Sequence, residues 1–395
     1  MTNGTASQQS AHTNENSFGE VVSFVEKHSK LLVLADAPDG ASIAIWPAMQ
    51  ARVLTSSVAG PKGLGFGWIN RELIASGEIA QHMNAVGGED RIWLGPEGGQ
   101  YSIFFAPGVP FDLEHWFTPA PLDTEAFDLV SQTKTSAAFR RDFSLTNFSG
   151  TKFEVRIDRE VRLLSSDKVW SGLGIEAVDG VKIVAYESEN KLTNLSKESM
   201  KKESGLLSLW VLGQFQSTPR TTVVLPFMPG PESELGVKVT TDYFGDVPED
   251  RILIGEDFVF FKGDSNWRSK LGLSPLRAKS ILGSYDAQNG VLTIAQYNKP
   301  SGPEMYVNSA WKIQEHPFSG DVVNTYNDGP AAPGQGQMGQ FYELETSSPA
   351  RELQSGEVME HTHRTIHFEG SEQQLDAICQ RTLGVRIADI RKFNS

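Results

Sequence analysis

Short runs of β-branched and aromatic residues, separated by turn signals, dominate this sequence from Leu31 to Phe368. Such runs are typical of strands, and the apolar periodicity of long helices is missing from this part of the sequence. The Asn289-Gly290 pair predicts a hairpin between Ser284–Ala287 and Val291–Tyr297. We therefore expect a mainly β protein. The other predicted strands include Leu31–Leu34, Ile43–Trp46, Tyr101–Phe105, Leu206–Leu212, Thr221–Leu225 and Phe258–Phe261.

Short helices are expected near both ends of the chain. Ser17-Phe18-Gly19-Glu20 has the spacing of a capping box and precedes an apolar stripe. Ser371-Glu372-Gln373-Gln374 has the same spacing and predicts a C-terminal helix at about residues 371–383. Two further short helices are predicted near Asn70–Gly77 and Asp123–Leu129.

The sequence predicts one large domain behind a short tail. Residues 1–17 are polar and have neither the basic start nor the apolar core of a signal peptide, so we expect a disordered tail there. Residues 18–395 contain no internal repeat and no dense linker. A strand-rich region of this length exceeds a seven- to nine-stranded sandwich, so the sheets must be large.

Charge and cysteine content exclude several classes of protein. The sequence has 35 Lys and Arg against 49 Asp and Glu, a net charge of −14, and no dense basic run, which disfavours a nucleic-acid partner. Cys379 is the single cysteine, so neither an internal disulfide nor a thiolate metal site can form. No apolar run approaches the length of a membrane span. We therefore expect a cytoplasmic protein with no membrane partner.

A glycine-rich segment, residues 82–100, combines aromatic and charged side chains. Glycines allow close approach of backbone or ligand, and the segment adds Arg91, Trp93, Glu89 and Glu97. Aromatic faces pack against the C–H side of a sugar ring, and planar charged groups form paired hydrogen bonds with hydroxyls. The segment therefore indicates a sugar site. The alternative is a tight turn region in which Arg91 merely pairs with Glu89.

A histidine row lies near the C-terminus. If Glu360–Phe368 is a strand, alternation places His361, His363, Thr365 and His367 on one face. Three interpretations compete. The His-x-His pair could hold a metal in a loosely cupin-like arrangement, the row could be a structural hydrogen-bonded set, or it could supply acid/base or substrate-binding groups.

Two glutamates and a polar turn add candidate groups near these histidines. Glu343 and Glu345 share one face of their own predicted strand. A carboxylate beside a histidine is a minimal acid/base pair. Asn324–Gly329, which includes Asn327, is either a polar turn near a cleft or an ordinary Asn/Asp turn.

Several of these segments resemble the galactose-mutarotase-like (aldose 1-epimerase-like) superfamily. Glu187–Asn194 is similar to its mid-chain "E-x-x-N-x-L-x-N" motif. Leu344-Glu345-Thr346, Ser355-Gly356-Glu357 and Thr365–Phe368 are together similar to its C-terminal "L-E-T … P-G-E … T-x-x-F" segment. Gly87–Trp93 resembles the "G-G-x-R-x-W" segment of uncharacterised members.

The resemblance implies a β-supersandwich of large antiparallel sheets with a carbohydrate cleft on a concave face. Enzymes of the superfamily interconvert sugar anomers without a cofactor: a glutamate deprotonates the anomeric hydroxyl and a histidine protonates the ring oxygen. Glu345 matches the glutamate by position. The mid-chain "H-P-Y-F-N" motif that carries the histidine is missing between Val181 and Asp264, so the chain resembles an uncharacterised branch rather than a true mutarotase.

Our leading hypothesis is a carbohydrate-active isomerase of the aldose-epimerase type. Its substrate would be a small sugar or an oligosaccharide, and no cofactor or metal is expected. The alternatives are a non-catalytic carbohydrate-binding module and a metal-assisted sugar lyase. The predicted catalytic residues are the base Glu345 and an acid among His82, His361 and His363; the predicted substrate-binding residues are Arg91, Trp93, Glu97, Glu89, Asn327 and His367.

Overall fold

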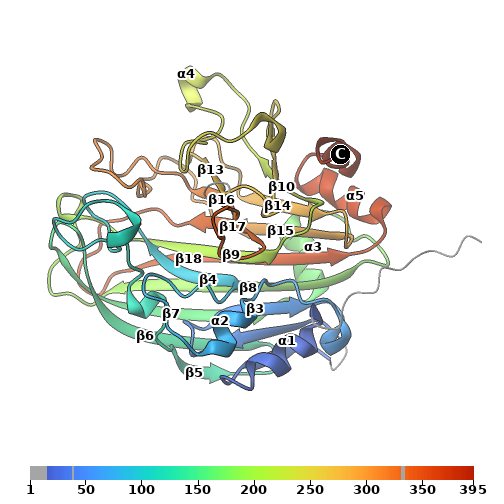
Figure 1. Ribbon diagram of the computed structural model, residues 1–395, viewed down its shortest axis with the longest axis horizontal. Helices are drawn as coiled ribbons and strands as arrows, with labels where there is room; N and C mark the ends of the chain where they lie inside the picture. The colour runs from blue at the N-terminus through green and yellow to red at the C-terminus, as the bar shows by residue number, and fades with distance from the viewer. Residues whose placement is uncertain (1–15, 38–39, 331–333) are drawn as a thin grey trace, which may run out of the picture.

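Two antiparallel sheets, one of eight strands and one of ten, form most of the protein (Figure 1). The computed structural model describes residues 16–37, 40–330 and 334–395. The high strand content and the short terminal helices confirm the predicted fold class. Of the predicted tail, residues 1–15 lie outside the described part of the chain, and the single domain at 18–395 stays a prediction.

The eight-stranded sheet carries the predicted sugar-binding segment and the two glutamates. Its strands pair antiparallel throughout. Their spatial order is β1 (Leu32–Ala35), β2 (Ser42–Trp46), β3 (Arg52–Ser57), β4 (Gly88–Gly95), β9 (Ser208–Gln216), β17 (Phe341–Ser347), β16 (Val323–Asn327) and β13 (Ser269–Leu273).

The ten-stranded sheet carries the histidine row and the predicted hairpin, whose two strands pair as expected. Its spatial order is β11 (Ile252–Ile254), β12 (Phe258–Lys262), β10 (Thr221–Pro226), β14 (Ile281–Asp286), β15 (Val291–Tyr297), β18 (Val358–Glu369), β8 (Lys182–Asn194), β7 (Lys152–Leu163), β6 (Ser136–Thr146) and β5 (Asp128–Gln132).

Capping chemistry explains the terminal helices. The Ser17 side chain accepts a hydrogen bond from the Glu20 backbone at the start of α1. Ser371 and Gln374 form the predicted capping box of α5. The six helices are α1 (Phe18–Val25), α2 (Arg71–Ser76), α3 (Ser166–Leu173), α4 (Glu232–Leu235), α5 (Glu372–Thr382) and α6 (Ile387–Phe393) in the described part of the chain.

Three local predictions were wrong. Asp123–Leu129 is not a helix, because a 3-10 turn ends at Leu122 and β5 begins at Asp128. Tyr101–Phe105 lies in a loop, where its aromatic residues pack against other loops instead of pairing as a strand. Asn324–Gly329 is not a turn, since most of it belongs to β16.

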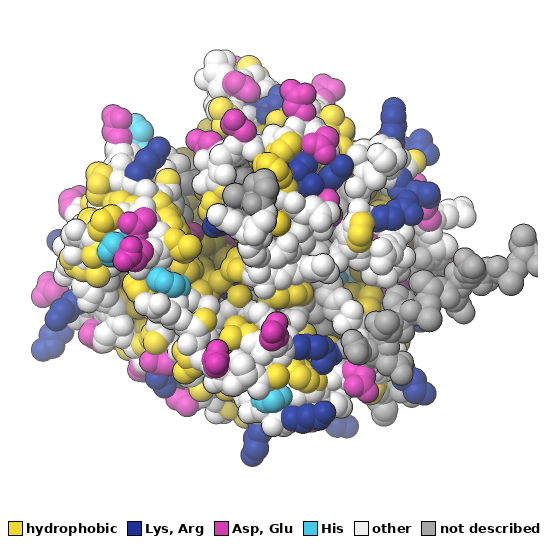
Figure 2. All heavy atoms as spheres, in the orientation of Figure 1, with side chains coloured by type: hydrophobic (Ala, Val, Ile, Leu, Met, Phe, Trp, Pro, Cys, Tyr) yellow, Lys and Arg dark blue, Asp and Glu magenta, His cyan; other side chains and the backbone are white. Residues whose placement is uncertain are grey.

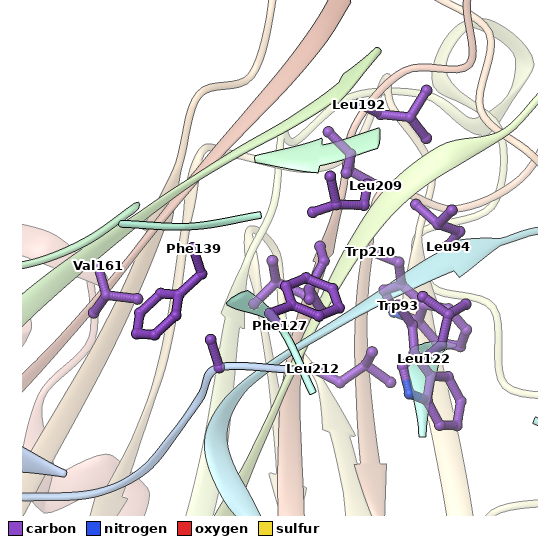
Figure 3. Packing of buried hydrophobic residues seen from close by; sticks show 14 of the residues in the cluster. Trp93, Leu94, Leu122, Phe127, Phe139, Val161, Leu192, Leu209, Trp210 and Leu212 are labelled. Atoms are coloured by element: carbon purple, nitrogen blue, oxygen red, sulfur yellow. The ribbon is translucent and has the colours of Figure 1, made fainter. Parts of the chain in front are cut away.

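The sheets pack face to face through alternate residues of their strands. Leu209 of β9 lies in one buried cluster with Val161 and Leu192 of the other sheet (Figure 3). Trp210 follows Leu209 on β9, so its side chain points to the opposite face of the sheet. There it packs edge-on against Trp93 of β4. The eight-stranded sheet is thus buried on both faces, and its outer face is covered by loops.

A layer of charged and polar groups crosses the core between the sheets. Arg159 of β7 donates to Asp90 of β4 at 2.6 Å, and both side chains have no exposed area. Arg159 also donates to Asn190 at 2.6 Å, while Ser188 donates to Asp90 at 2.7 Å. Because buried charges require partners, this layer fixes how the two sheets align.

We expect Arg159→Met to lower the free energy of unfolding by about 3–5 kcal/mol, because it leaves the Asp90 carboxylate buried without its cation. The matched control is Arg140→Met, which breaks the neighbouring exposed pair between Arg140 and Asp158. That variant should cost at most about 1 kcal/mol. Urea unfolding of both variants checks the prediction, and equal losses would contradict it.

Candidate active site

A cleft of about 580 Å³ lies on the outer face of the eight-stranded sheet. Its floor comes from β9, β13 and β16, and its walls come from segments 240–244 and 307–312. In Figure 2 the molecule is hollowed between the protrusion that carries α4 and the loops to its left. The cleft therefore joins segments that are far apart in the sequence.

Glu345 is a fully buried carboxylate that lies beneath two residues of the cleft lining, Trp210 and Lys270. Its Oε2 accepts a hydrogen bond from Lys270 Nζ at 2.9 Å and another from Trp210 Nε1 at 3.0 Å. Its Oε1 is buried and accepts no hydrogen bond from any described residue. One carboxylate oxygen is therefore fixed by two donors, whereas the other is buried and unpaired.

Three strands of the eight-stranded sheet supply Glu345 and its two donors. Alternate side chains of these strands share one face of the sheet. Glu345 lies on β17, with Trp210 on the adjacent strand β9 and Lys270 two strands away on β13. Lys270 Nζ lies 4.8 Å from the ring centroid of Trp210 and 5.8 Å from that of Tyr243. Burial disfavours the Lys270 ammonium, but Glu345 and other nearby carboxylates outweigh burial and raise its pKa.

Glu343 and Arg91 form a second ion pair on the same face. Arg91 Nη2 lies 2.8 Å from Glu343 Oε1, and the Arg91 guanidinium carbon lies 4.6 Å from the Trp93 ring centroid. Burial raises the pKa of Glu343 to about 7, although Arg91 opposes this shift. Arg91 therefore pairs with Glu343, and the alternative pairing with Glu89 is wrong.

Glu97 lines the cleft just beyond the end of β4. Its Oε1 accepts a hydrogen bond from Trp311 Nε1 at 3.2 Å. Burial raises the pKa of Glu97, Lys270 opposes the shift, and the negative charge of Glu345 adds to it. Glu97 thus keeps a proton to higher pH than an ordinary glutamate does.

Asp321 and Tyr243 form a hydrogen-bonded pair on the cleft wall. The Tyr243 hydroxyl donates to Asp321 Oδ2 at 2.6 Å and accepts from Asn324 Nδ2 at 3.1 Å. Burial raises the pKa of Asp321, although the hydrogen bond from Tyr243 opposes the shift. Gly272 makes room for this pair, because a Cβ there would lie 2.0 Å from Asp321 Oδ2.

The structure brings four of the predicted site residues to one face of the eight-stranded sheet. Glu97 lines the cleft, and Glu345 lies beneath the lining residue Trp210. Arg91 and Trp93 lie on the same face beneath covering loops. Aromatic, basic and acidic groups therefore gather there, as the sugar-site prediction requires.

The histidine row lies between the two sheets. His361 Nε2 and His363 Nδ1 lie 2.8 and 2.9 Å from Thr346 Oγ1, and all three side chains are buried. Thr346 follows Glu345 on β17, so its side chain points to the opposite face of that strand. The catalytic role of these histidines stays a prediction, but they do not line the cleft.

His367 and Glu89 also meet between the sheets. His367 Nε2 lies 3.1 Å from Glu89 Oε2, which also accepts hydrogen bonds from Tyr186 at 3.1 Å and Ser56 at 2.8 Å. The substrate-binding roles predicted for His367 and Glu89 stay predictions. Their contacts tie the two sheets together on the side away from the cleft.

His82 and Asn327 lie apart from the cleft lining. His82 Nδ1 is 2.7 Å from the Trp116 carbonyl oxygen, and its ring lies 4.6 Å from that of Phe117. Asn327 accepts from the Ser265 backbone and donates to the Trp267 carbonyl, both at 2.9 Å. Both site assignments stay predictions.

Sequence reasoning missed Lys270, Trp210, Tyr243 and Asp321. A lysine inside the short apolar strand Ser269–Leu273 was an available signal, because a buried lysine requires an acidic partner. The other three give no local signal, because Trp210 meets Glu345 through the pairing of β9 with β17, and Tyr243 and Asp321 come from separate loops. Within the described residues, no group of three or more His, Cys, Asp or Glu is placed to hold a metal ion.

Comparison with protein families gives one match. Residues 16–394 match a family of unknown function, DUF6786. The chain belongs to this family. A search among curated proteins finds no significant match.

Solved structures of aldose 1-epimerase-like proteins share the fold of this family member, which is the fold that the sequence motifs predicted. A candidate aldose 1-epimerase of Escherichia coli K12 has a TM-score of 0.51 at 12% identity, over 87% of this chain and 100% of that one. The Slr1438 protein of Synechocystis sp. PCC 6803 has a TM-score of 0.51 at 10% identity, over 87% and 96% of the two chains. Among the residues described for this family member, none of the helices is long and apolar enough to span a membrane.

The buried histidines predict a loss of stability in acid. Burial lowers the pKa of His361 to about 3 and that of His363 to about 4, from a usual value of 6.5. Above pH 6.5 both imidazoles are neutral in the folded and the unfolded chain. As the pH falls from 6.5 toward 4, the unfolded chain binds protons that the folded chain does not, so the free energy of unfolding falls.

Each histidine should steepen this fall by up to about 1.4 kcal/mol per pH unit. We expect His361→Gln and His363→Gln each to flatten the pH dependence of urea unfolding between pH 6.5 and 4. His316→Gln is the control, because His316 is exposed and should leave the slope unchanged. Identical slopes in all variants would contradict the assignment.

Proposed function

We propose that this protein is an aldose-epimerase-like enzyme that binds a sugar in the cleft above Glu345. The observation that carries the proposal is the state of that carboxylate. Lys270 and Trp210 hold one of its oxygens, and the other is buried without a hydrogen bond from the described residues. An oriented carboxylate with one free oxygen is suited to accept a proton from a bound hydroxyl.

Aromatic rings along the cleft support a sugar as the ligand. Trp210, Tyr243, Phe244 and Trp311 line it together with the amide of Asn324. Rings of this kind pack against the apolar C–H face of a pyranose, while amide and acidic groups bind its hydroxyls.

In the proposed reaction Glu345 takes the proton from the anomeric hydroxyl, and the electron pair of that O–H bond forms the carbonyl as the C1–O5 bond breaks. The ring oxygen takes a proton from an acid and becomes a hydroxyl. Rotation about C1–C2 presents the other carbonyl face, and the reverse steps close the ring as the other anomer. Lys270 and Trp210 keep the base in place throughout.

Glu97 is the acid that the cleft favours. Burial raises the pKa of Glu97, so this side chain keeps a proton to higher pH than an ordinary glutamate does. A pair of carboxyl groups in different environments divides acid and base roles in this way. In this proposal Glu97 takes the role that the mid-chain histidine has in true mutarotases.

Glu345→Gln should reduce the rate of anomer exchange by about 10²- to 10⁴-fold, because the amide does not accept the proton. NMR exchange between anomers of common aldoses and their acidic derivatives measures the rate. Glu360→Gln is the matched control, since Glu360 is an exposed glutamate outside the cleft lining that pairs with Lys191. Equal rates for the wild type and both variants would rule out the proposed base.

The acid assignment predicts a pH dependence. An acid must be protonated, so the rate should fall as the pH rises through the raised pKa of Glu97. Glu97→Gln should lower kcat and remove this alkaline decline. If the variant keeps both the rate and the decline, Glu97 is not the acid. Sugar binding without any exchange in the wild type would instead favour the non-catalytic carbohydrate-binding module.

A further inference from the structure

Arg268 contributes a cation to the cleft that has no anionic partner. Its Nε is buried and forms no hydrogen bond, and no carboxylate in the described parts of the chain lies within ion-pair distance. The other two basic groups on this face differ, because Lys270 bonds to Glu345 and Arg91 bonds to Glu343. An unpaired guanidinium in a partly buried position is costly unless a ligand neutralises it.

Phe244 holds the Arg268 side chain against the cleft wall. The guanidinium carbon lies 4.3 Å from the ring centroid of Phe244. Contact with an aromatic face leaves the edge of a guanidinium free for two parallel N–H···O bonds to one oxyanion. This geometry selects a charged group over a single hydroxyl.

The charges around Arg268 favour an anion. Lys312 also lines the cleft, and within the described chain it has no ion-pair partner. The lining carboxyls Glu97 and Asp321 have raised pKa values, chiefly because they are buried, which reduces the negative charge that they carry. Asp242 is an exposed carboxylate on the same lining. The cleft lining thus contains two cations without an ion-pair partner among the described residues, Arg268 and Lys312, and one exposed carboxylate, Asp242.

We infer that the cleft is built for an anionic sugar, whose carboxylate or phosphate group pairs with the Arg268 guanidinium. This inference rests on the proposed function, because it names the substrate class of the same cleft. Arg268 would be a specificity-determining residue, while Glu345 and Glu97 act on the anomeric centre.

The test compares anomer exchange of D-glucuronate and D-glucose 6-phosphate with that of D-glucose and D-galactose. We expect kcat/KM to be at least about tenfold higher for an anionic sugar, as one charge-assisted pair provides. Arg268→Gln should lower that value by about 10- to 100-fold, mainly through KM, and should lower kcat/KM for D-glucose by a much smaller factor. Arg268→Lys should restore part of the loss. Arg220→Gln, an exposed arginine outside the cleft lining, is the matched control.

The outcomes separate this inference from the proposed function. Preference for glucuronate over the phosphate, or the reverse, supports the inference and identifies the anionic group. Equal turnover of neutral and anionic sugars, unaffected by Arg268→Gln, overturns the inference and keeps the proposed function.

Calorimetric titration covers the case in which no sugar is turned over. If glucuronate or glucose 6-phosphate binds and Arg268→Gln weakens this binding, the inference is kept and the proposed epimerase function is ruled out. If neither anion binds, the inference is overturned.

Discussion

Burial of β17 on both faces is the constraint on which this structure depends, because every polar side chain of that strand must then find a partner. On the inner face Thr346 contacts His361 and His363 of the other sheet. On the outer face Glu343 pairs with Arg91, and Glu345 pairs with Lys270 and Trp210. One strand therefore links the core between the sheets to the floor of the cleft.

The electrostatic character of the cleft follows from unequal pairing. Glu345 has a cation and an indole N–H on one oxygen, while burial raises the pKa of Glu97. Glu97 therefore keeps its proton to higher pH than an ordinary glutamate does, and the proposed acid role of this side chain rests on that shift. Arg268, without such a partner, leaves positive charge for a ligand to neutralise.

Sequence patterns predicted what depends on neighbours along the chain. Period-two alternation placed Glu343 and Glu345 on one face, and the "L-E-T" motif matched Glu345 to the catalytic glutamate of mutarotase-like proteins. Capping spacing predicted α1 and α5. Arg91, Trp93 and Glu97 of the glycine-rich segment lie on the face that bears Glu345, whereas Glu89 of the same segment lies between the sheets.

What the sequence did not reveal depends on pairing between distant strands. Alternation aligned His361, His363 and His367, but it does not say which sheet they face, and they turn toward the core. Lys270 reaches Glu345 because β16 pairs with β13 on one side and with β17 on the other, which brings these distant segments into one sheet. Asp321 and Tyr243 come from separate loops, so no local pattern connects them.

A crystal structure of the Glu345→Gln variant with bound D-glucuronate tests the central claim most directly. We expect the anomeric hydroxyl within hydrogen-bond distance of the residue 345 side chain, the ring against the cleft's aromatic residues, and the carboxylate on Arg268. A sugar bound elsewhere on the molecule, with the cleft above residue 345 empty, would contradict the account.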